Sequence, residues 1–319
     1  MAEIRNVAII GAGLMGCGIA QVFASHPDHR VTTFDSYTPG PVVLERVRGN
    51  LAMLAGKGAI STAEIAALMG RITPMESIAK AVAQADLVME CIPEQMELKQ
   101  NLFAELEGLC QPGAIFATNT SVMSITEIAS KAESRHRIVG THFWNPPYLI
   151  PLVEVVKSEY TDDTVVDATM AVLKKAGKHP VRVNRDVPGF LANRLQHALW
   201  REAISIVEHG IADAASVDEA IRLGFGLRLP VLGPMENADM VGTDLTLSIH
   251  QYILPHLESS PRPSPLLEER VQKGELGFKT GQGFQTWTPQ AAEASRKHLV
   301  EYLIDVLYKQ PVEAPPIQS

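Results

Sequence analysis

The chain of 319 residues contains little cysteine and no concentrated charge of one sign. Its three cysteines, Cys17, Cys91 and Cys110, are widely spaced, so we expect neither a disulfide framework nor a Cys/His metal site. Free thiols of this kind indicate a reducing, cytoplasmic compartment. The net charge of -8 is spread along the chain, which argues against a partner that is a nucleic acid or an anionic membrane. An anionic substrate would have to be bound by local donors.

Long apolar runs are also missing. No stretch of about 18 uninterrupted apolar residues suggests a membrane span. No basic segment followed by a cleavage site occurs near Met1, so we expect no signal peptide. What the chain does have is 46% hydrophobic residues, which is enough for a large core, and a length that favours two domains. We therefore expect a soluble protein.

Apolar strand-like runs alternate with helical patterns over the first 186 residues. Strands are expected at residues 6–10, 30–34, 86–89, 113–117, 137–141 and 152–156. Helices are expected at residues 15–25, 42–55, 62–69 and 94–109. This alternation predicts an α/β domain over residues 1–186, with a mostly parallel sheet covered by helices on both faces.

The pattern changes at Asp186-Val-Pro-Gly-Phe190, where proline and glycine interrupt the chain. Helical patterns follow one another from there, beginning with a helix over residues 190–209 that ends at Gly210. We predict an all-α domain over residues 187–310. Residues 311–319 are rich in proline and are expected to form a flexible tail.

The segment Gly11-Ala-Gly13-Leu14-Met15-Gly16 has the spacing GxGxxG and lies between the first expected strand and the first expected helix. The first glycine allows a tight turn, the second lets the backbone approach a pyrophosphate, and the third lets helix and strand pack closely. Free N–H groups and the helix dipole then favour the anion. This context predicts a dinucleotide site in a Rossmann-type, doubly wound fold.

Asp35, at the end of the second expected strand, indicates which dinucleotide binds. A carboxylate there accepts hydrogen bonds from ribose hydroxyls and repels a 2′-phosphate, and no arginine follows in Ser36-Tyr37. We therefore predict NAD as the cofactor. A simple turn carboxylate would occupy the same position.

His142 and Glu154 form the candidate catalytic pair. His142 ends an apolar strand at the sheet edge where ligands bind in such folds, and histidine titrates near neutral pH, as a general base should. Glu154 lies inside the apolar run Leu152–Val156, where a buried carboxylate needs a partner. The alternative is a core histidine and an unrelated salt bridge.

Several segments in register resemble the 3-hydroxyacyl-CoA dehydrogenase family, and the resemblance covers most of the chain. They are Gly11–Ala20, Glu90-Cys-Ile-Pro-Glu94, Thr118-Asn119-Thr-Ser121, His142-Phe-Trp-Asn-Pro146 with Leu152-Val-Glu154, Pro188–Arg194, Gly233-Pro234 with Asp239 and Gly242, and Lys279–Phe284. The resemblance implies an oxidoreductase that moves a hydride between NAD and the 3-position of a 3-hydroxy substrate. It also implies a homodimer formed through the helical domain.

The resemblance assigns a role to each matching position. It implies that His142 is the base, that Glu154 orients it, and that Ser121 and Asn193 contact the substrate. It places Glu94, Lys99, Asn119 and Asn145 beside the cofactor, together with the glycine loop. Simpler interpretations are that Ser121 caps a helix starting near Ser124 and that Lys99 lies on a solvated helix face.

The chain departs from the CoA-using members of the family in two regions. Pro147-Tyr-Leu-Ile-Pro151 resembles the side branch of lambda-crystallin (L-gulonate 3-dehydrogenase), carnitine dehydrogenase and a pyridine-carboxylate dehydrogenase, which act on small free acids. Residues 36–70 contain only Arg46, Arg48 and Lys57 as cations, which offers few partners to a CoA phosphate. Arg228 is a candidate for binding a substrate carboxylate, or else a solvated arginine. A CoA thioester and a free acid both stay open.

Two other functions are weighed against this one. A 3-hydroxyisobutyrate or 6-phosphogluconate type of dehydrogenase shares the glycine loop but uses a lysine base, and its lysine motif is missing here. A non-catalytic, crystallin-like NAD-binding protein would not need the set Ser121, His142, Glu154 and Asn193.

Overall fold

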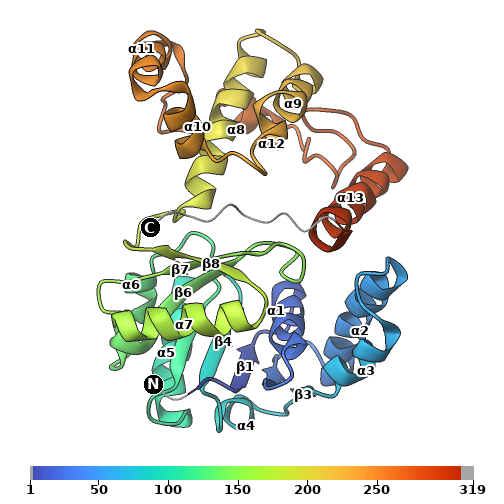
Figure 1. The fold of residues 1–319 in the computed structure, drawn as a ribbon, viewed down its shortest axis with the longest axis vertical. Helices are drawn as coiled ribbons and strands as arrows, with labels where there is room; N and C mark the ends of the chain where they lie inside the picture. Colours follow the sequence, from blue (N-terminus) through green and yellow to red (C-terminus); the bar gives the residue numbers. More distant parts are fainter. Residues whose placement is uncertain (1–2, 310–319) are drawn as a thin grey trace. The chain divides into compact units, whose positions relative to one another are not determined.

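The computed structural model describes residues 3–309, and the chain divides into two compact units after Arg194. The first unit is built on one sheet with the strand order β3-β2-β1-β4-β5-β6-β7-β8 (Figure 1). The strands are β1 (Asn6–Ile10), β2 (Arg30–Phe34), β3 (Ile72–Pro74), β4 (Leu87–Glu90), β5 (Ile115–Thr118), β6 (Ile138–Phe143), β7 (Leu152–Val156) and β8 (His179–Val183). All neighbouring strands are parallel except β6 and β7. The predicted mostly parallel, doubly wound sheet is confirmed.

Helices cover both faces of this sheet. The helices packed on one face are α1 (Leu14–Ser25), α2 (Gly40–Gly56), α3 (Thr62–Met69) and α7 (Asp163–Lys175). Those on the other face are α4 (Ile78–Val82), α5 (Met96–Leu109) and α6 (Ile125–Ile128). Short 3-10 turns at Ala129–Lys131 and Arg135–Arg137 lead into β6.

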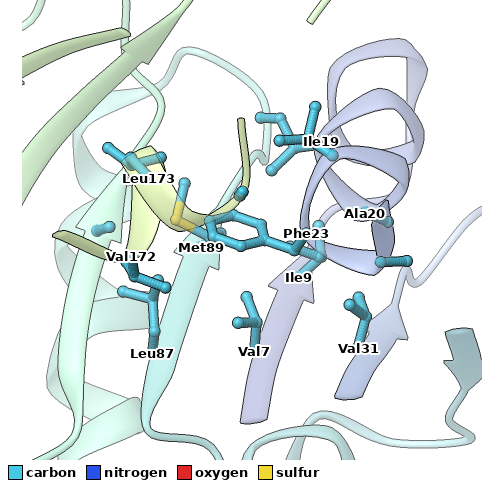
Figure 2. Close-up of a cluster of buried hydrophobic side chains, with 14 of the residues drawn as sticks. Val7, Ile9, Ile19, Ala20, Phe23, Val31, Leu87, Met89, Val172 and Leu173 are labelled. Carbon is cyan, nitrogen blue, oxygen red and sulfur yellow. The ribbon is translucent and has the colours of Figure 1, made fainter. Parts of the chain in front are cut away.

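The central strand β1 is apolar from Val7 to Ile10 because both of its faces are covered. Val7 and Ile9 point to the face of α1 and α7, where Figure 2 shows them with Phe23 and Leu173. Ala8 and Ile10 belong to the cluster on the opposite face. Successive side chains of a strand alternate between faces, so a strand covered on both sides is a nearly continuous apolar run. Because β1 packs into both apolar clusters, the glycine loop that follows it is anchored to both.

The structure adds two strands that the apolar pattern does not predict. β3 has three residues, ends in Pro74 and pairs only with β2 at the sheet edge. β8 begins His179-Pro180 and is the opposite edge. Edge strands can be short and can contain proline because one side of the ladder makes no hydrogen bonds. Their formation is decided by the neighbouring strand.

The second unit is helical, as predicted. Its helices are α8 (Ala192–Glu208), which begins in the first unit, α9 (Ala214–Leu223), α10 (Pro234–Val241), α11 (Thr243–Ile253), α12 (Pro265–Gln272) and α13 (Pro289–Ile304), followed by a π-helical turn at Asp305–Lys309. Short 3-10 turns lie at Phe225–Leu227 and Leu254–His256. No helix within residues 3–309 is both long and apolar enough to cross a membrane. The predicted tail at 311–319 lies outside the described residues.

Candidate active site

The sheet order reverses between β1 and β4, and the carboxyl ends of these two parallel strands lie side by side. The glycine loop leaves the end of β1, and Glu90 is the last residue of β4, in register with Ile10. In open α/β sheets such a switch point is where ligands bind. The strand order therefore brings the glycine loop and the segment that begins at Glu90 together at the carboxyl ends of the strands.

The three glycines of the loop meet different steric conditions. Gly11 has φ 92°, and a Cβ on it would lie 2.6 Å from the carbonyl of Cys91. A Cβ on Gly16 would lie 1.9 Å from the carbonyl oxygen of Gly11. A Cβ on Gly13 would meet no atom within 4 Å. The outer glycines are thus required by the fold, whereas Gly13 leaves open space in front of the loop.

This open space lies at the N-terminus of α1. Gly13 precedes the first helical residue, Leu14, and no side chain caps the helix there. The first turn holds no acidic residue, and Leu14 is 70% exposed. Unused N–H groups with a positive helix end and no competing carboxylate fit the pyrophosphate of a dinucleotide. The predicted cofactor segment, including Leu14 and Met15, therefore has the donors that NAD needs.

Asp35 follows β2 and reaches back to the glycine loop. Its Oδ2 accepts a hydrogen bond of 2.6 Å from the N–H of Ala12. Its Oδ1 accepts the N–H groups of Tyr37 and Thr38, both at 2.8 Å. The carboxylate thus organises its own turn as well as the loop. Arg46 of α2, which the sequence reasoning did not place here, donates to the carbonyl of Ala12 at 3.4 Å.

A cavity of about 430 Å³ opens beside Asp35. Its apolar wall comes from residues of β2, α2 and the end of β3, namely Phe34, Val43, Leu44, Pro74 and Met75. Glu76 also lines it, and no lysine or arginine does. An apolar slot with only acidic charge suits an uncharged aromatic ring better than a phosphate. The prolines and Met75 carry no motif, so only the fold could reveal this wall.

His142 and Glu154 face each other across the one antiparallel strand pair. They are direct register partners on β6 and β7. Nδ1 of His142 lies 2.7 Å from Oε2 of Glu154. His142 is 5% exposed and Glu154 is fully buried. Directly opposed residues of antiparallel strands point to the same face, so the register itself forms the pair.

The imidazole is confined by two aromatic rings. Trp144 lies 5.3 Å away and Phe190 lies 5.8 Å away, measured between ring centroids. The Trp144 indole N–H also reaches Oε2 of Glu154, at 3.4 Å. Nε2 of His142 makes no hydrogen bond to any residue within 3–309, which leaves this nitrogen for a substrate.

Four donors satisfy the buried carboxylate of Glu154. Besides His142 and Trp144, the N–H groups of Leu191 and Ala192 donate to Oε1, each at 2.9 Å. Burial raises the pKa of Glu154, but the hydrogen bonds from His142 and the two backbone N–H groups outweigh it. The pKa therefore lies below its ordinary value, and Glu154 is an anion at neutral pH.

Ser121 is held through its backbone on both sides. Its N–H donates to Oε1 of Glu94 at 3.0 Å, and its carbonyl accepts from Nδ2 of Asn193 at 3.0 Å. Ser121 is exposed and does not cap α6, because the cap is Ser124, whose hydroxyl accepts from Glu127. The helix-cap interpretation of Ser121 was therefore wrong. The structure brings Ser121, Asn193 and Glu94 together.

Lys99 is not on a solvated helix face, and that alternative is wrong as well. The side chain is 1% exposed and lies 2.7 Å from Oε1 of Glu90 and 3.2 Å from Oε2 of Glu94. Glu90 is fully buried and also accepts from the Thr118 hydroxyl at 2.6 Å. Burial raises the pKa of Glu90, against the opposing effects of Lys99 and Thr118. This buried cluster connects the end of β4 to the Ser121 loop through Glu94.

The two motif asparagines differ in environment. Oδ1 of Asn119, after β5, accepts the N–H of Phe143 at 3.0 Å, which holds the end of β6 beside β5. Asn145 is exposed and precedes a cis peptide bond to Pro146. The Asn119 side chain thus makes a hydrogen bond that stabilises the fold, whereas the Asn145 side chain remains accessible.

The segment after Asn145 is anchored by residues that carry no sequence signal. The Lys178 amine donates to the carbonyls of Pro147 and Ile150, the latter at 2.9 Å. Burial lowers the pKa of Lys178 to about 8. A Cβ on Gly18 would lie 2.7 Å from the Pro147 ring, so the segment packs directly on α1. The segment after the histidine is therefore fixed against the helix of the glycine loop.

Two further residues are described separately from this group. Arg228 is in the second unit, exposed, after the 3-10 turn Phe225–Leu227, and its guanidinium pairs with no residue within 3–309. His29 is fully buried, with Nδ1 2.9 Å from the carbonyl of Phe23. Burial lowers the pKa of His29. The described residues contain no acidic, cysteine and histidine cluster able to hold a metal ion.

The site thus combines the buried Glu154 anion with His142, whose Nε2 makes no hydrogen bond within residues 3–309. Both residues lie on the sheet that also carries the glycine loop. Such a pair can take up a proton and stabilise the resulting imidazolium. The Ser121 loop, fixed by Glu94 and Asn193, presents a hydroxyl that makes no hydrogen bond within the described chain. This arrangement allows removal of a proton by His142, coupled to transfer of a hydride to a bound dinucleotide.

Sequence comparisons match both units to one family. Residues 6–187 match the NAD-binding domain of 3-hydroxyacyl-CoA dehydrogenase, and residues 189–287 match its C-terminal domain.

Three relatives illustrate the range of dehydrogenases that resemble this chain. A 5-formyl-3-hydroxy-2-methylpyridine 4-carboxylate 5-dehydrogenase of Mesorhizobium japonicum is 33% identical, covering 95% of this chain and 97% of its own. A solved structure of that description has a TM-score of 0.86, covering 96% and 98% at 33% identity. A probable 3-hydroxybutyryl-CoA dehydrogenase of Bacillus subtilis is 37% identical (88% and 97%). An L-carnitine dehydrogenase of Streptomyces griseus is 39% identical (75% and 70%).

Proposed function

The chain belongs to the 3-hydroxyacyl-CoA dehydrogenase family, and from this premise we propose that it oxidises the 3-hydroxyl of a 3-hydroxyacyl substrate to the 3-oxo product. It is an NAD-dependent oxidoreductase acting on CH–OH. The observation that carries the proposal is the 2.7 Å contact between His142 and the buried Glu154, on the sheet that bears the glycine loop.

In the oxidation, Nε2 of His142 takes the proton of the substrate hydroxyl. The buried Glu154 anion stabilises the imidazolium that forms, and Nδ1 keeps the ring oriented. Ser121 and Asn193 hold the substrate oxygen. Bound NAD would supply the acceptor for the hydride from the carbon that bears the hydroxyl, so that the O–H and C–H bonds are broken and the C=O bond forms. In the reverse direction His142 returns the proton.

The cofactor rests on the glycine loop in this proposal. Gly11, Gly13, Leu14, Met15 and Gly16 supply the turn and the N–H groups at the start of α1. The ribose hydroxyls meet Asp35, and the adenine ring fits the apolar cavity beside it. The predicted contacts also include Glu94, Lys99, Asn119 and Asn145. The acidic lining at Asp35 and Glu76 disfavours the additional phosphate of NADP.

Within the substrate class we propose a small free hydroxy acid. The helices α2 and α3, with the turn between them, carry few cations, and Arg46 already donates to the glycine loop. The Pro147–Pro151 segment, held down by Lys178, separates this chain from the CoA-using pattern. In this proposal Arg228 binds the substrate carboxylate. A CoA thioester is the second candidate, favoured by the 37% identity to a probable 3-hydroxybutyryl-CoA dehydrogenase.

We further propose that residues 1–186 bind the cofactor and that residues 187–310 serve the substrate and a homodimer. The small number of buried residues in the second unit supports the dimer. After Arg194 the described buried residues are Ser205, Val217, Gly283, Ala292 and Ile304. The three free cysteines support a reducing, cytoplasmic location.

The test follows NADH formation at alkaline pH by the purified full chain with 3-hydroxybutyryl-CoA, 3-hydroxybutyrate, L-gulonate and L-carnitine. Turnover of a free acid but not of the thioester is expected. Turnover of the thioester alone would overturn the free-acid proposal and indicate fatty-acid metabolism. No turnover of any 3-hydroxy substrate would contradict the dehydrogenase assignment. His142→Asn serves as the control and should lose at least about a hundredfold in rate while binding NAD normally.

A further inference from the structure

Glu154 has a second set of contacts, which the proton transfer itself does not explain. Its Oε1 accepts two backbone N–H groups, from Leu191 and Ala192, both at 2.9 Å. Ala192 is the first residue of α8, which has 17 residues. The buried carboxylate therefore occupies the N-terminus of a long helix while its other oxygen faces His142. A helix N-terminus favours the charged form of a carboxylate.

The turn before α8, which orients these N–H groups, has an unusual backbone conformation. Gly189 has φ 75° and Phe190 has φ 50°. Phe190 is the one non-glycine residue with positive φ among those that the structure describes. An aromatic residue adopts this conformation only when its surroundings hold it there. Here the Phe190 ring is 2% exposed and packs 5.8 Å from the imidazole of His142.

We propose that the left-handed Gly189–Phe190 turn is a positioning device that clamps Glu154 with two N–H groups and so keeps it ionised during turnover. The inference rests on the proposed function and adds to it Gly189, Phe190 and Ala192 as positioning residues. Phe190 acts twice, because its backbone directs the donors and its ring limits the movement of the base. The clamp sets the lowest pH at which His142 can act as a base.

Within residues 3–309, no charged side chain other than His142 contacts Glu154. His142 is the titratable group that faces the carboxylate from β6. Arg194, in the first turn of α8, directs its guanidinium to the carbonyl of Pro188, at 3.5 Å. Asp186, before the turn, accepts from Ser124 and Thr126. The two N–H groups and the imidazole therefore offset the burial of the anion between them.

Ala192→Pro removes one of the two donors with little other change, because proline is well tolerated at the first position of a helix. Without this hydrogen bond Glu154 should be protonated at higher pH. A carboxylate that accepts one hydrogen bond fewer is more basic and also holds the proton of the His142 imidazolium more strongly. The acid limb of the pH profile of kcat/KM should therefore move upward by about one pH unit, with the alkaline plateau retained. The matched control is Ala214→Pro at the first position of α9, where the alanine N–H donates to no side chain within residues 3–309. It should leave the profile unchanged.

A second pair of variants tests the turn without removing an N–H group. Gly189→Ala strains the left-handed backbone, and the added Cβ meets nothing closer than 3.5 Å. Gly210→Ala strains another left-handed glycine, with φ 66° and open space around it. Both should lower the melting temperature to a similar degree. Only Gly189→Ala should move the acid limb. Acid limbs that coincide for wild type, Ala192→Pro and Gly189→Ala would overturn the clamp.

A measurement without substrate separates this inference from the proposed function. Infrared difference spectra recorded during a pH titration show the band of a protonated carboxyl group, and Glu154→Gln identifies the band of Glu154. The midpoint should be higher in Ala192→Pro than in wild type and in Ala214→Pro. A shifted midpoint in a protein that turns over none of the test substrates would support the clamp and sink only the dehydrogenase assignment. An unshifted midpoint would contradict the clamp whatever the enzyme does.

Discussion

At the scale of single residues, the site depends on charges that are buried and paired. Glu154 and Glu90 are both fully buried, yet their pKa values move in opposite directions. For Glu154 the donors outweigh burial and its pKa is lowered. For Glu90 burial prevails over Lys99 and Thr118 and its pKa is raised. Glu154 is therefore suited to partner a base, whereas Glu90 relies on Lys99 and the Thr118 hydroxyl to offset its burial.

Lys99 should therefore matter for stability as well as for catalysis. Lys99→Met leaves Glu90 buried without its cation, and breaking such a pair costs about 3 kcal/mol or more of the free energy of unfolding. The Ser121 loop should loosen with it, because Glu94 loses its contact with Lys99, and kcat should fall. Urea unfolding and steady-state kinetics measure the two effects.

The matched control for Lys99→Met is Lys80→Met. Lys80 pairs with Glu76 on an exposed surface, 2.5 Å apart. Exposed pairs contribute little, so this variant should unfold like the wild type. Equal stability of the Lys99 and Lys80 variants would show that the buried cluster is not a stabilising element.

At the scale of elements, α1 and the loop before it combine two demands on one short segment. Gly16 has no room for a side chain because the Gly11 carbonyl lies against it, whereas Gly13 has open space. The fold therefore needs Gly16, whereas Gly13 is needed only by the proposed cofactor site. Strand β6 shows the same contrast between fold and function. Asn119 holds β6 beside β5, whereas His142 on β6 is the proposed base.

Two alanine variants should separate these demands. Gly16→Ala places a Cβ 1.9 Å from the Gly11 oxygen and should cost about 3 kcal/mol or prevent folding. Gly13→Ala should cost less than about 1 kcal/mol but lower NAD affinity at least about tenfold, because the methyl group stands where the pyrophosphate approaches. Thermal unfolding and calorimetric titration with NAD give the two quantities. Normal NAD affinity of Gly13→Ala would refute the assigned role of the loop.

At the scale of the whole molecule, the two units differ in how they are stabilised. The first has two apolar clusters, one on each face of the sheet. The second buries few of its described residues, and one face of α11 exposes Leu245, Ile249, Tyr252 and Ile253. An apolar helix face of this kind is typical of a surface that a partner covers. This is the physical basis of the proposed homodimer.

The dimer is tested by sedimentation equilibrium at micromolar concentration, where the wild type should have the mass of two chains. Ile249→Glu places a charge on the apolar face of α11 and should shift the population toward one chain. Gln251→Glu, an exposed polar position on the same helix, is the control and should leave the mass unchanged. A wild type of single-chain mass would contradict the homodimer.

The sequence by itself determined the features that local pattern encodes. Apolar periodicity predicted the central strands and the helices beside them, and the spacing of Gly11, Gly13 and Gly16 predicted a dinucleotide loop. The alternation of strands and helices predicted the fold class. These features depend on residues within one turn or one strand, where burial and backbone conformation follow directly from residue type. His142 and Glu154 stood out because each is a polar residue in an apolar strand.

Only the tertiary structure decided what those residues contact. The antiparallel register of β6 and β7 sets His142 opposite Glu154, and a turn some 37 residues further along gives Glu154 its two N–H donors. The burial of Lys99 and the reach of Asp35 to Ala12 likewise depend on strands brought together from distant parts of the chain. Hydrogen bonds between remote segments depend on strand order and register. No local pattern contains these, because they follow from how the whole sheet packs.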